Sequence, residues 1–362
     1  MSGAEVPLPD LALTPATRLL WRAPDSVQIE LADSAVVVEG LPAAVVAWLA
    51  APSGGPAPPR PRIDARVNDL LTALTEAGFL WPRPAGPADP RVAPPAPRLA
   101  GQLTSLVPRH GDAAADVLNA RRYATVEVTG RSRLVASVAA VLAAAGIGHV
   151  HCAVDGATKL HHLAPGGATP ADESAPLAVA AEAAVRRAAP DTHTAPLAPG
   201  ERPDLTVLAA EAPVADERLA ALHAAGAPYL AVRLGVDCGV VGPLVLPGRT
   251  SCPRCADRHR SDRDPAWDAL AVQLAIDRRP GPAADAAVAT TVAGVAAQQA
   301  LAFLDGGSTA TMDGTLELRL PDWRLRRRTW PRHPACACGH EAPIGAGGGA
   351  GAAGPDLGRM GG

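Results

Sequence analysis

The stretch YATVEVTGRSRLVASVAAVLAAAGIGHVHCAVD, from Tyr123 to Asp155, decides the fold class of this 362-residue chain. Tyr123–Thr129 is apolar and β-branched and predicts a strand, whereas the alanine-rich run Leu134–Ala145 predicts a helix. A glycine-containing break follows, and His149–Val154 predicts a second strand. A strand–helix–strand unit implies parallel strands covered by helices, so we expect an α/β domain with a Rossmann-like sheet.

The alternation of helices and strands continues beyond this unit. The expected elements are helices at 177–189 and 216–225 and strands at 205–209 and 229–234. The pattern then changes at Gly239–Gly248, an extended run with no helix directly after it. Two long helices near 265–277 and 283–304 and a terminal hairpin over 315–329 complete the body. We therefore expect a mostly parallel sheet to which antiparallel strands are appended.

A small unit precedes this body. Extended runs at 27–31 and 35–40 predict a hairpin, helices are expected at 41–51 and 63–78, and 79–81 is again extended. This order resembles a small winged helix. Seven prolines between 82 and 98 predict a linker, and the Gly/Ala-rich end predicts a disordered tail. The predicted division is residues 1–81 as a winged-helix-like domain, 82–98 as the linker, 99–340 as the α/β domain and 341–362 as the tail.

Composition narrows the classes of function. The formal net charge of -3 gives no reason to expect a nucleic-acid partner. The first residues carry no secretory signal, and the longest apolar run, Leu134–Gly148, is shorter than the ~18–20 residues of a membrane span. We expect a soluble, cytoplasmic protein without a membrane partner. In a reducing compartment its six cysteines favour a metal over disulfides.

Four of the cysteines form two tight pairs, Cys252-Pro253-Arg254-Cys255 and Cys336-Ala337-Cys338. Two short turns that each supply two thiolates are typical of structural zinc sites, so we predict one zinc held by Cys252, Cys255, Cys336 and Cys338. His333 or His340 could replace one sulfur, because a single residue separates the second pair. An isolated C-x-x-C pair could be redox-active, but we do not expect Cys252 to open a helix in a thioredoxin-like strand–helix–strand unit.

Other candidate ligands are weaker. We interpret Cys152 and Cys238 as core or incidental residues. The adjacent His161 and His162 lack a third ligand at helical spacing, so we expect both at the surface.

Together these residues resemble the ThiF/MoeB-type E1-like domain. The strand, glycine turn, Ala-rich helix and strand ending at Asp155 are similar to its opening, and the stretch GVVGPLVLPGRTSCPRC with the closing CACG is similar to its zinc region. The closer resemblance, over roughly 17–340, is to the E1-like proteins of azoline-forming peptide cyclodehydratases. Many of those bind a leader peptide through a winged-helix element at the amino end.

The phosphate loop of the family is altered in this sequence. An active member has a G-x-G-x-x-G-like turn, whereas this chain keeps Gly130 and places Ser132 and Val135 at the other two glycine positions. Asp155 stands where the family has a ribose-binding carboxylate, and it is equally interpreted as a turn former. Aspartates expected after the third strand are replaced by Ala209-Ala210-Glu211. We therefore predict a degenerate nucleotide site at Gly130, Ser132 and Asp155, at which ATP is doubtful and no catalytic residue is assigned. The arginines at 131 and 133 could still hold an anion.

The resemblance implies an auxiliary protein that binds the leader of a precursor peptide and presents it to a separate, ATP-using YcaO-type subunit. A homodimer is expected by analogy. The predicted peptide groove combines strand 27–31 or 36–39 with helix 63–78, with Arg66 and Asp69 at its rim and Leu70 and Leu74 as floor or core. Two alternatives remain: a ThiF/MoeB-type adenylyltransferase that activates a sulfur carrier or ubiquitin-like carboxyl terminus, and a structural subunit that binds no peptide.

Overall fold

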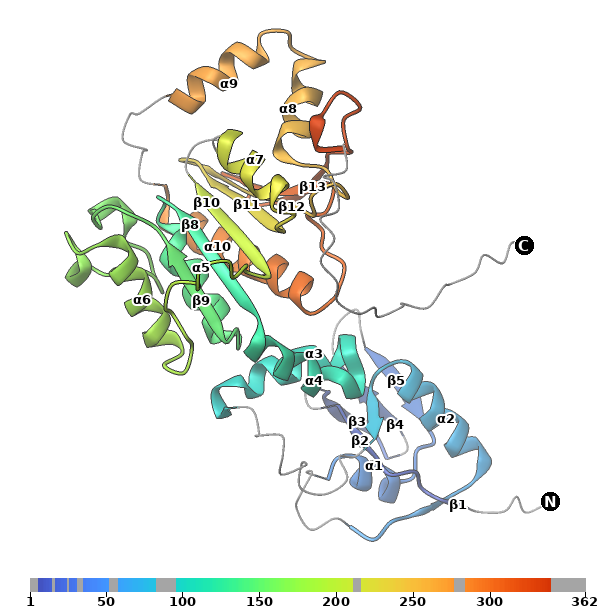
Figure 1. Ribbon diagram of the computed structural model, residues 1–362. Helices are drawn as coiled ribbons and strands as arrows, with labels where there is room; N and C mark the ends of the chain where they lie inside the picture. The colour runs from blue at the N-terminus through green and yellow to red at the C-terminus, as the bar shows by residue number, and fades with distance from the viewer. Residues whose placement is uncertain are drawn as a thin grey trace.

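The computed structural model describes residues 6–14, 17–24, 26–30, 35–51, 58–82, 96–210, 216–276 and 284–339. The amino-terminal module, drawn in blue, lies at one end of the larger α/β body (Figure 1). The predicted tail from 341 and residues 83–95 of the predicted linker lie outside the described residues.

A seven-stranded sheet in the order β14-β13-β12-β11-β10-β8-β9 forms the centre of the body. The parallel strands are β8 (Thr125–Gly130), β9 (His149–Ala153), β10 (Leu205–Ala210) and β11 (Tyr229–Leu234). The antiparallel strands are β12 (Cys238–Val245), β13 (Gly314–Arg319) and β14 (Leu325–Thr329). This mixed sheet confirms the predicted parallel core with antiparallel strands appended at one side.

Helices cover both faces of the sheet. On one face α5 (Leu134–Ala144) and α10 (Ala286–Leu304) pack together in the main hydrophobic core, with α6 (Leu177–Ala188) against α5. On the other face α7 (Asp216–Ala224) packs Leu219 and Leu222 against Leu208 of β10 and Tyr229 of β11. The expected βα alternation therefore gives a covered sheet (Figure 1).

Within the described residues, α10 is one helix long and apolar enough to cross a membrane by length and composition. It nevertheless packs against α5 and β12, and residues such as Val288, Val292 and Ala296 are buried. An Ala/Val-rich helix with no strongly polar face is typical of the interior of a large domain, so α10 serves as a core helix.

The amino-terminal module has a hydrophobic core of its own. A three-stranded sheet joins β3 (Leu19–Ala23), β4 (Ser26–Ile29) and β5 (Val36–Glu39), and Val27 pairs with Val38. Helices α1 (Ala43–Leu49) and α2 (Ala65–Glu76) cover it, and the short pairs β1 (Val6–Pro7) with β6 (Arg62–Ile63) and β2 (Leu11–Leu13) with β7 (Leu80–Pro82) close it. The predicted hairpin and both helices are present. The winged-helix assignment stays a prediction.

The structure contains elements that the sequence patterns did not suggest. These are β1, β2, β3, β6, α3 (Ala100–His110), α4 (Ala114–Ala120) and α8 (Pro253–Ser261). The helix expected near 265–277 is α9 (Trp267–Ile276). Helix α3 was missed because Pro108 lies inside it and a Pro-rich run precedes it. Ile63 belongs to β6, because Asp64 caps α2 by accepting a hydrogen bond from the Val67 amide.

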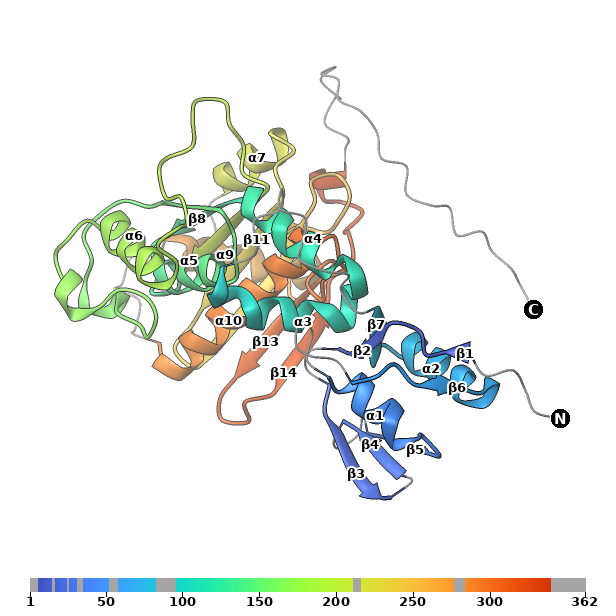
Figure 2. The ribbon, with the colours of Figure 1, turned by 90° about the horizontal axis from the view of Figure 1, so that it is seen from below.

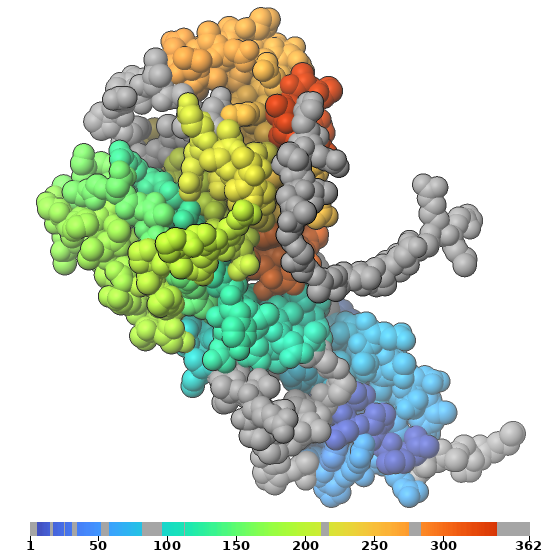
Figure 3. Space-filling model, viewed as in Figure 1, coloured from blue at the N-terminus to red at the C-terminus, as the bar shows by residue number. Residues whose placement is uncertain are grey.

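Helices α3 and α4 lie between the module and the sheet (Figure 2). They form a small apolar cluster with Trp81 of β7, which includes Leu99, Leu106 and Leu118. Figure 3 shows this teal segment in contact with both parts on the visible face. The two parts are therefore joined by packed side chains as well as by the chain itself.

A buried ion pair braces this junction to the core. The Arg121 guanidinium donates to both carboxylate oxygens of Asp305, at 2.8 and 2.7 Å, and the two side chains are 3% and 5% exposed. It also donates to the Ala145 carbonyl at 2.9 Å. The end of α4 is thereby fixed to the ends of α5 and α10.

Candidate functional site

The turn between β8 and α5 lies at the carboxyl edge of the parallel strands, where α/β sheets bind ligands. Gly130 has φ +132°, and a Cβ added there would lie 1.8 Å from the Ala209 carbonyl oxygen of β10. Only glycine fits at this position, since the clash is with backbone. Gly130 is therefore required by the close approach of β8 and β10, whether or not a phosphate binds.

Ser132 turns into the protein. Its side chain is buried, and its hydroxyl donates to the Ala209 carbonyl at 3.2 Å and accepts from the Leu134 amide at 3.3 Å. Val135 is fully buried in the main core. Ser132 and Val135, which replace glycines of the family pattern, are therefore both buried. The Ser132 hydroxyl makes its two hydrogen bonds to the backbone, at Ala209 and at Leu134 in the turn.

Asp155 is paired with Arg131. The guanidinium donates to both carboxylate oxygens, at 3.0 and 2.7 Å, and both side chains remain exposed. These hydrogen bonds, with the charge of Arg131, lower the pKa of Asp155, and Asp155 raises the pKa of Arg131. The sequence analysis grouped Gly130, Ser132 and Asp155 in one site but did not predict the ion pair with Arg131. This ion pair engages the same carboxylate that the family resemblance assigns to ribose binding.

Arg133 has a structural role. Its guanidinium donates to the carbonyl oxygens of Leu163 and Ala284. It therefore ties the turn to the segment after β9 and to the residues just before α10. Three of the five N–H donors of Arg133 therefore face backbone carbonyls, and anion binding by Arg131 or Arg133 stays a prediction. Glu211, the other candidate carboxylate, lies outside the described residues.

His162 is buried, which corrects the expectation of a surface histidine. Its Nδ1 accepts a hydrogen bond from the Lys159 amide at 3.2 Å. Burial lowers the pKa of His162 to about 4, so the ring is neutral at physiological pH. His161 lies beside it with its ring edge-on.

The four paired cysteines converge on one point. The Sγ–Sγ distances are 3.9 Å for Cys252–Cys255, 3.8 Å for Cys252–Cys336 and 3.3 Å for Cys255–Cys338, and all four sulfurs lie within 4.8 Å of one another. Three of the side chains are buried. Sulfurs at the corners of a tetrahedron around zinc, each about 2.3 Å from the metal, would be about 3.8 Å apart. The cluster therefore has the dimensions to hold a metal ion.

A hydrogen bond from Cys252 lowers the pKa of Cys255, whereas burial raises the pKa of Cys338. Cysteine binds zinc as a thiolate, so a metal held at this cluster would displace thiol protons.

Two further details of this site bear on the sequence interpretation. Cys252 is the N-cap residue of α8, but the preceding strand β12 is antiparallel to its neighbours, so the pair does not lie in a thioredoxin-like strand–helix–strand unit. His333 is not a fourth ligand: its Nε2 donates to Asp262 at 2.9 Å and its Nδ1 accepts from the Ala335 amide at 3.1 Å. Both ring nitrogens are in use. His340 lies outside the described residues.

The remaining cysteines stand apart from this cluster. Cys152 is buried in β9, and burial raises the pKa of its thiol to about 12. Cys238 begins β12 and is half-buried. Cys152 is a core residue, as expected.

Comparison with solved structures identifies proteins with a similar fold. The crystal structure of E. coli MccB with MccA-N7isoAsn superimposes with a TM-score of 0.69 at 16% identity, covering 91% of this chain and all of MccB. The chain has a ThiF/MoeB-like E1 fold. MccB with ATP gives a TM-score of 0.68 at 16% identity over 91% of this chain, and the structure of PaaA gives 0.55 at 17% over 73%. No family model and no curated protein matches the sequence.

These E1-like neighbours bear on the predicted cofactor. One crystal structure of E. coli MccB contains ATP, another contains both AMPCPP and MccA, and a further structure of MccB contains N-formylated MccA. The fold therefore accommodates a nucleotide in MccB, and the comparisons give no support to the prediction that ATP is doubtful. That prediction rests only on the residues of this chain.

The predicted peptide groove lies in the amino-terminal module. β5 is at an edge of the three-stranded sheet, and Val36 and Val37 are 37% and 46% exposed. The Arg66 side chain from the first turn of α2 reaches the residue after β5, since a Cβ added to Gly40 would be 2.7 Å from its guanidinium. Leu74 is core, whereas Leu70 is half-buried and Asp69 is exposed.

Proposed function

We propose that this chain is a peptide-binding auxiliary protein. Its amino-terminal module captures the leader of a precursor peptide, and a separate YcaO-type subunit then uses ATP to form azolines on that peptide. The observation that carries the proposal is the exposed, apolar edge strand β5.

An edge strand can accept one further strand. β5 pairs with β4 on one side, and no strand in the described part of the chain pairs with its other side. An edge of this kind offers outward-pointing amides and carbonyls to an extended peptide, and side chains beside it provide selectivity. Val36 and Val37 supply exposed apolar surface on the strand, with Leu70, Arg66 and Asp69 of α2 as further contacts.

The E1-like body supports the proposal in two ways. E. coli MccB, which has this fold, has been crystallised with MccA, and this supports a peptide partner for this chain. The four-cysteine cluster fits a structural zinc, because all four tetrahedral positions would be filled by protein sulfurs. We assign no catalytic residue to this chain, and we propose that its body forms a homodimer.

Calorimetry on the full-length protein tests the peptide site. The probe is a synthetic leader from a short precursor gene beside the gene for this chain. The variant Val37→Glu introduces a charge on the exposed edge, and Val179→Glu makes the same change at a valine of α6 that is 52% exposed. We expect micromolar or tighter binding (about -8 kcal/mol), at least tenfold weaker for Val37→Glu and unchanged for Val179→Glu. If Val37→Glu and Val179→Glu bound the leader peptide with equal affinity, the peptide site would not be at β5.

A second candidate is the adenylyltransferase, favoured by the crystal structures of E. coli MccB with ATP and AMPCPP. ATP–pyrophosphate exchange with the same peptide, or with a neighbouring sulfur-carrier protein, separates the two functions. Exchange that is lost on Asp155→Asn would establish adenylation by this chain. Peptide binding without exchange supports the auxiliary role.

A further inference from the structure

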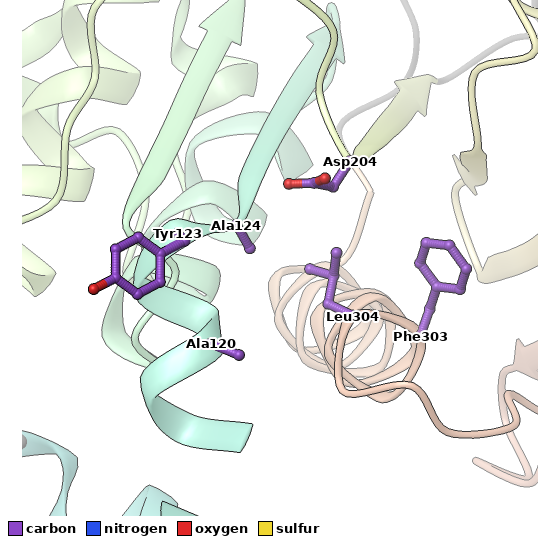
Figure 4. Close-up of a pocket in the computed structure, with 6 residues that line it drawn as sticks. All are labelled: Ala120, Tyr123, Ala124, Asp204, Phe303 and Leu304. Atoms are coloured by element: carbon purple, nitrogen blue, oxygen red, sulfur yellow. The ribbon is translucent and has the colours of Figure 1, made fainter. Parts of the chain in front are cut away.

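A hollow at the amino ends of β8 and β10 is open to solvent (Figure 4). It is lined by Ala120, Tyr123, Ala124, Asp204, Phe303 and Leu304. Tyr123 is 84% exposed and its ring points away from Asp204, so these two side chains do not form a common binding surface. Charged groups suited to selecting a ligand lie elsewhere, at the end of β5 in the amino-terminal module.

The two faces of β5 have different surroundings. Val38 faces the core of the module together with its β4 neighbour Val27, and both are buried. Because side chains alternate along a strand, Val37 and Glu39 lie together on the opposite face. Val37 is 46% exposed, and Glu39 is exposed as well. An apolar and an acidic side chain therefore lie two residues apart on the solvent face of this edge strand.

The Glu39 carboxylate has no hydrogen-bond or ion-pair partner among the described residues. The residue opposite it on β4 is Ser26, which carries no charge. Arg22, a cation on the same face of the sheet, donates to Gln28 at 3.0 Å. A carboxylate of this kind, on an open edge strand, can pair with a cation on an added strand.

A cation lies beside the same end of β5. Gly40, with φ +76°, directly follows Glu39, and a Cβ added to it would be 2.7 Å from the Arg66 guanidinium. The absence of a side chain at Gly40 therefore leaves room for Arg66 at the strand end. Asp64, the acid nearest to Arg66 in sequence, accepts a hydrogen bond from the Val67 amide instead. In the described part of the chain, the exposed Arg66 makes no ion pair.

We infer that the leader bound at β5 carries a basic residue opposite Glu39 and an apolar residue two positions away, opposite Val37. This rests on the peptide site proposed above. Residues two apart on an added strand point to the same face, so both contacts form together. Opposite charges directly across two strands stabilise their pairing, whereas like charges weaken it. The leader residue next to the basic one lies near Arg66 and is acidic by the same reasoning.

Calorimetry on the full-length protein tests the pairing, with the synthetic leader from the neighbouring precursor gene as the probe. Glu39→Lys turns attraction into repulsion, so it should weaken binding by about threefold or more. Replacing the basic residue of the leader by Glu should weaken binding to the wild-type protein by a similar factor. This modified leader should bind Glu39→Lys as tightly as the original leader binds the wild type, which would also show that the variant is folded.

Two further variants complete the design. Arg66→Glu should weaken binding of the original leader, and a leader with Lys in place of its acidic residue should restore it. Glu76→Lys makes the same change of charge as Glu39→Lys, at an exposed residue in the last turn of α2. Glu76 lies about 15 Å from Arg66 along the helix, so Glu76→Lys should leave binding unchanged.

The outcomes separate the charge pattern from the peptide site itself. A leader that does not bind the wild-type protein would overturn both. A leader that binds but has no basic residue two positions from an apolar one would overturn the charge pattern alone. Equal binding by Glu39→Lys and Glu76→Lys, or weakened binding that the modified leader does not restore, would also overturn the charge pattern and leave the β5 site in place.

Discussion

Replacing Arg121 by methionine removes one half of an ion pair that is buried on both sides. Methionine keeps the apolar stem but leaves Asp305, which is 5% exposed, without its two charged hydrogen bonds at 2.8 and 2.7 Å. Removing one partner of such a pair costs about 3–5 kcal/mol, because the remaining charge stays buried and unpaired. We expect Arg121→Met to lower the free energy of unfolding by this amount in urea titrations followed by circular dichroism.

The chain contains a matched control for this experiment. Arg131 and Asp155 form the same two-pronged contact, but their side chains are 71% and 76% exposed, so Arg131→Met should change stability little. The double variant Arg121→Met with Asp305→Leu removes both charges and should be more stable than Arg121→Met alone. Equal effects of Arg121→Met and Arg131→Met, or a double variant as unstable as the sum of its parts, would refute the reasoning from burial.

Three further predictions follow from the site. Elemental analysis should find about one zinc per chain, and Cys255→Ser should release it and lower the melting temperature; metal-free protein with an unchanged melting temperature would contradict a structural zinc. Gly130→Ala should strongly lower the melting temperature, because the new Cβ would lie 1.8 Å from the Ala209 carbonyl oxygen. Gly156→Ala, where a new Cβ has nothing within 4 Å, should lower it far less. Burial lowers the pKa of His162 in the folded protein to about 4, whereas in the unfolded chain it is about 6.5. As the pH drops from about 6.5 towards 4, the unfolded chain takes up a proton at His162 and the folded protein does not, so the free energy of unfolding should fall. His162→Gln should flatten that part of the stability–pH curve; an unchanged curve would show that the folded protein also accepts the proton.

Local patterns predicted the body well, because its elements are set by residues close in sequence. The β8–α5–β9 unit, the antiparallel β12 and the final hairpin each follow from periodicity and from glycine or proline breaks. The convergence of two cysteine pairs 84 residues apart was also predictable, since a thiolate pair has few other uses in a reducing compartment.

Features that depend on tertiary contacts were not predictable in this way. Arg131 and Asp155 are 24 residues apart, and neither side chain signals its partner. His162 looked like a surface residue because a short polar loop gives no period from which burial can be inferred.

The cysteine cluster also has a consequence for how the chain is made. Cys252 and Cys255 at the start of α8 must await Cys336 and Cys338, which follow the last strand. At about 5–20 residues per second, the ribosome needs roughly 4–17 seconds to synthesise the intervening stretch. During that time α9, α10 and the terminal hairpin are synthesised before all four cysteines are present. If the four cysteines hold a metal, the complete site can form only on a chain translated past Cys338, and a chain that ends earlier would lack two of the four sulfurs.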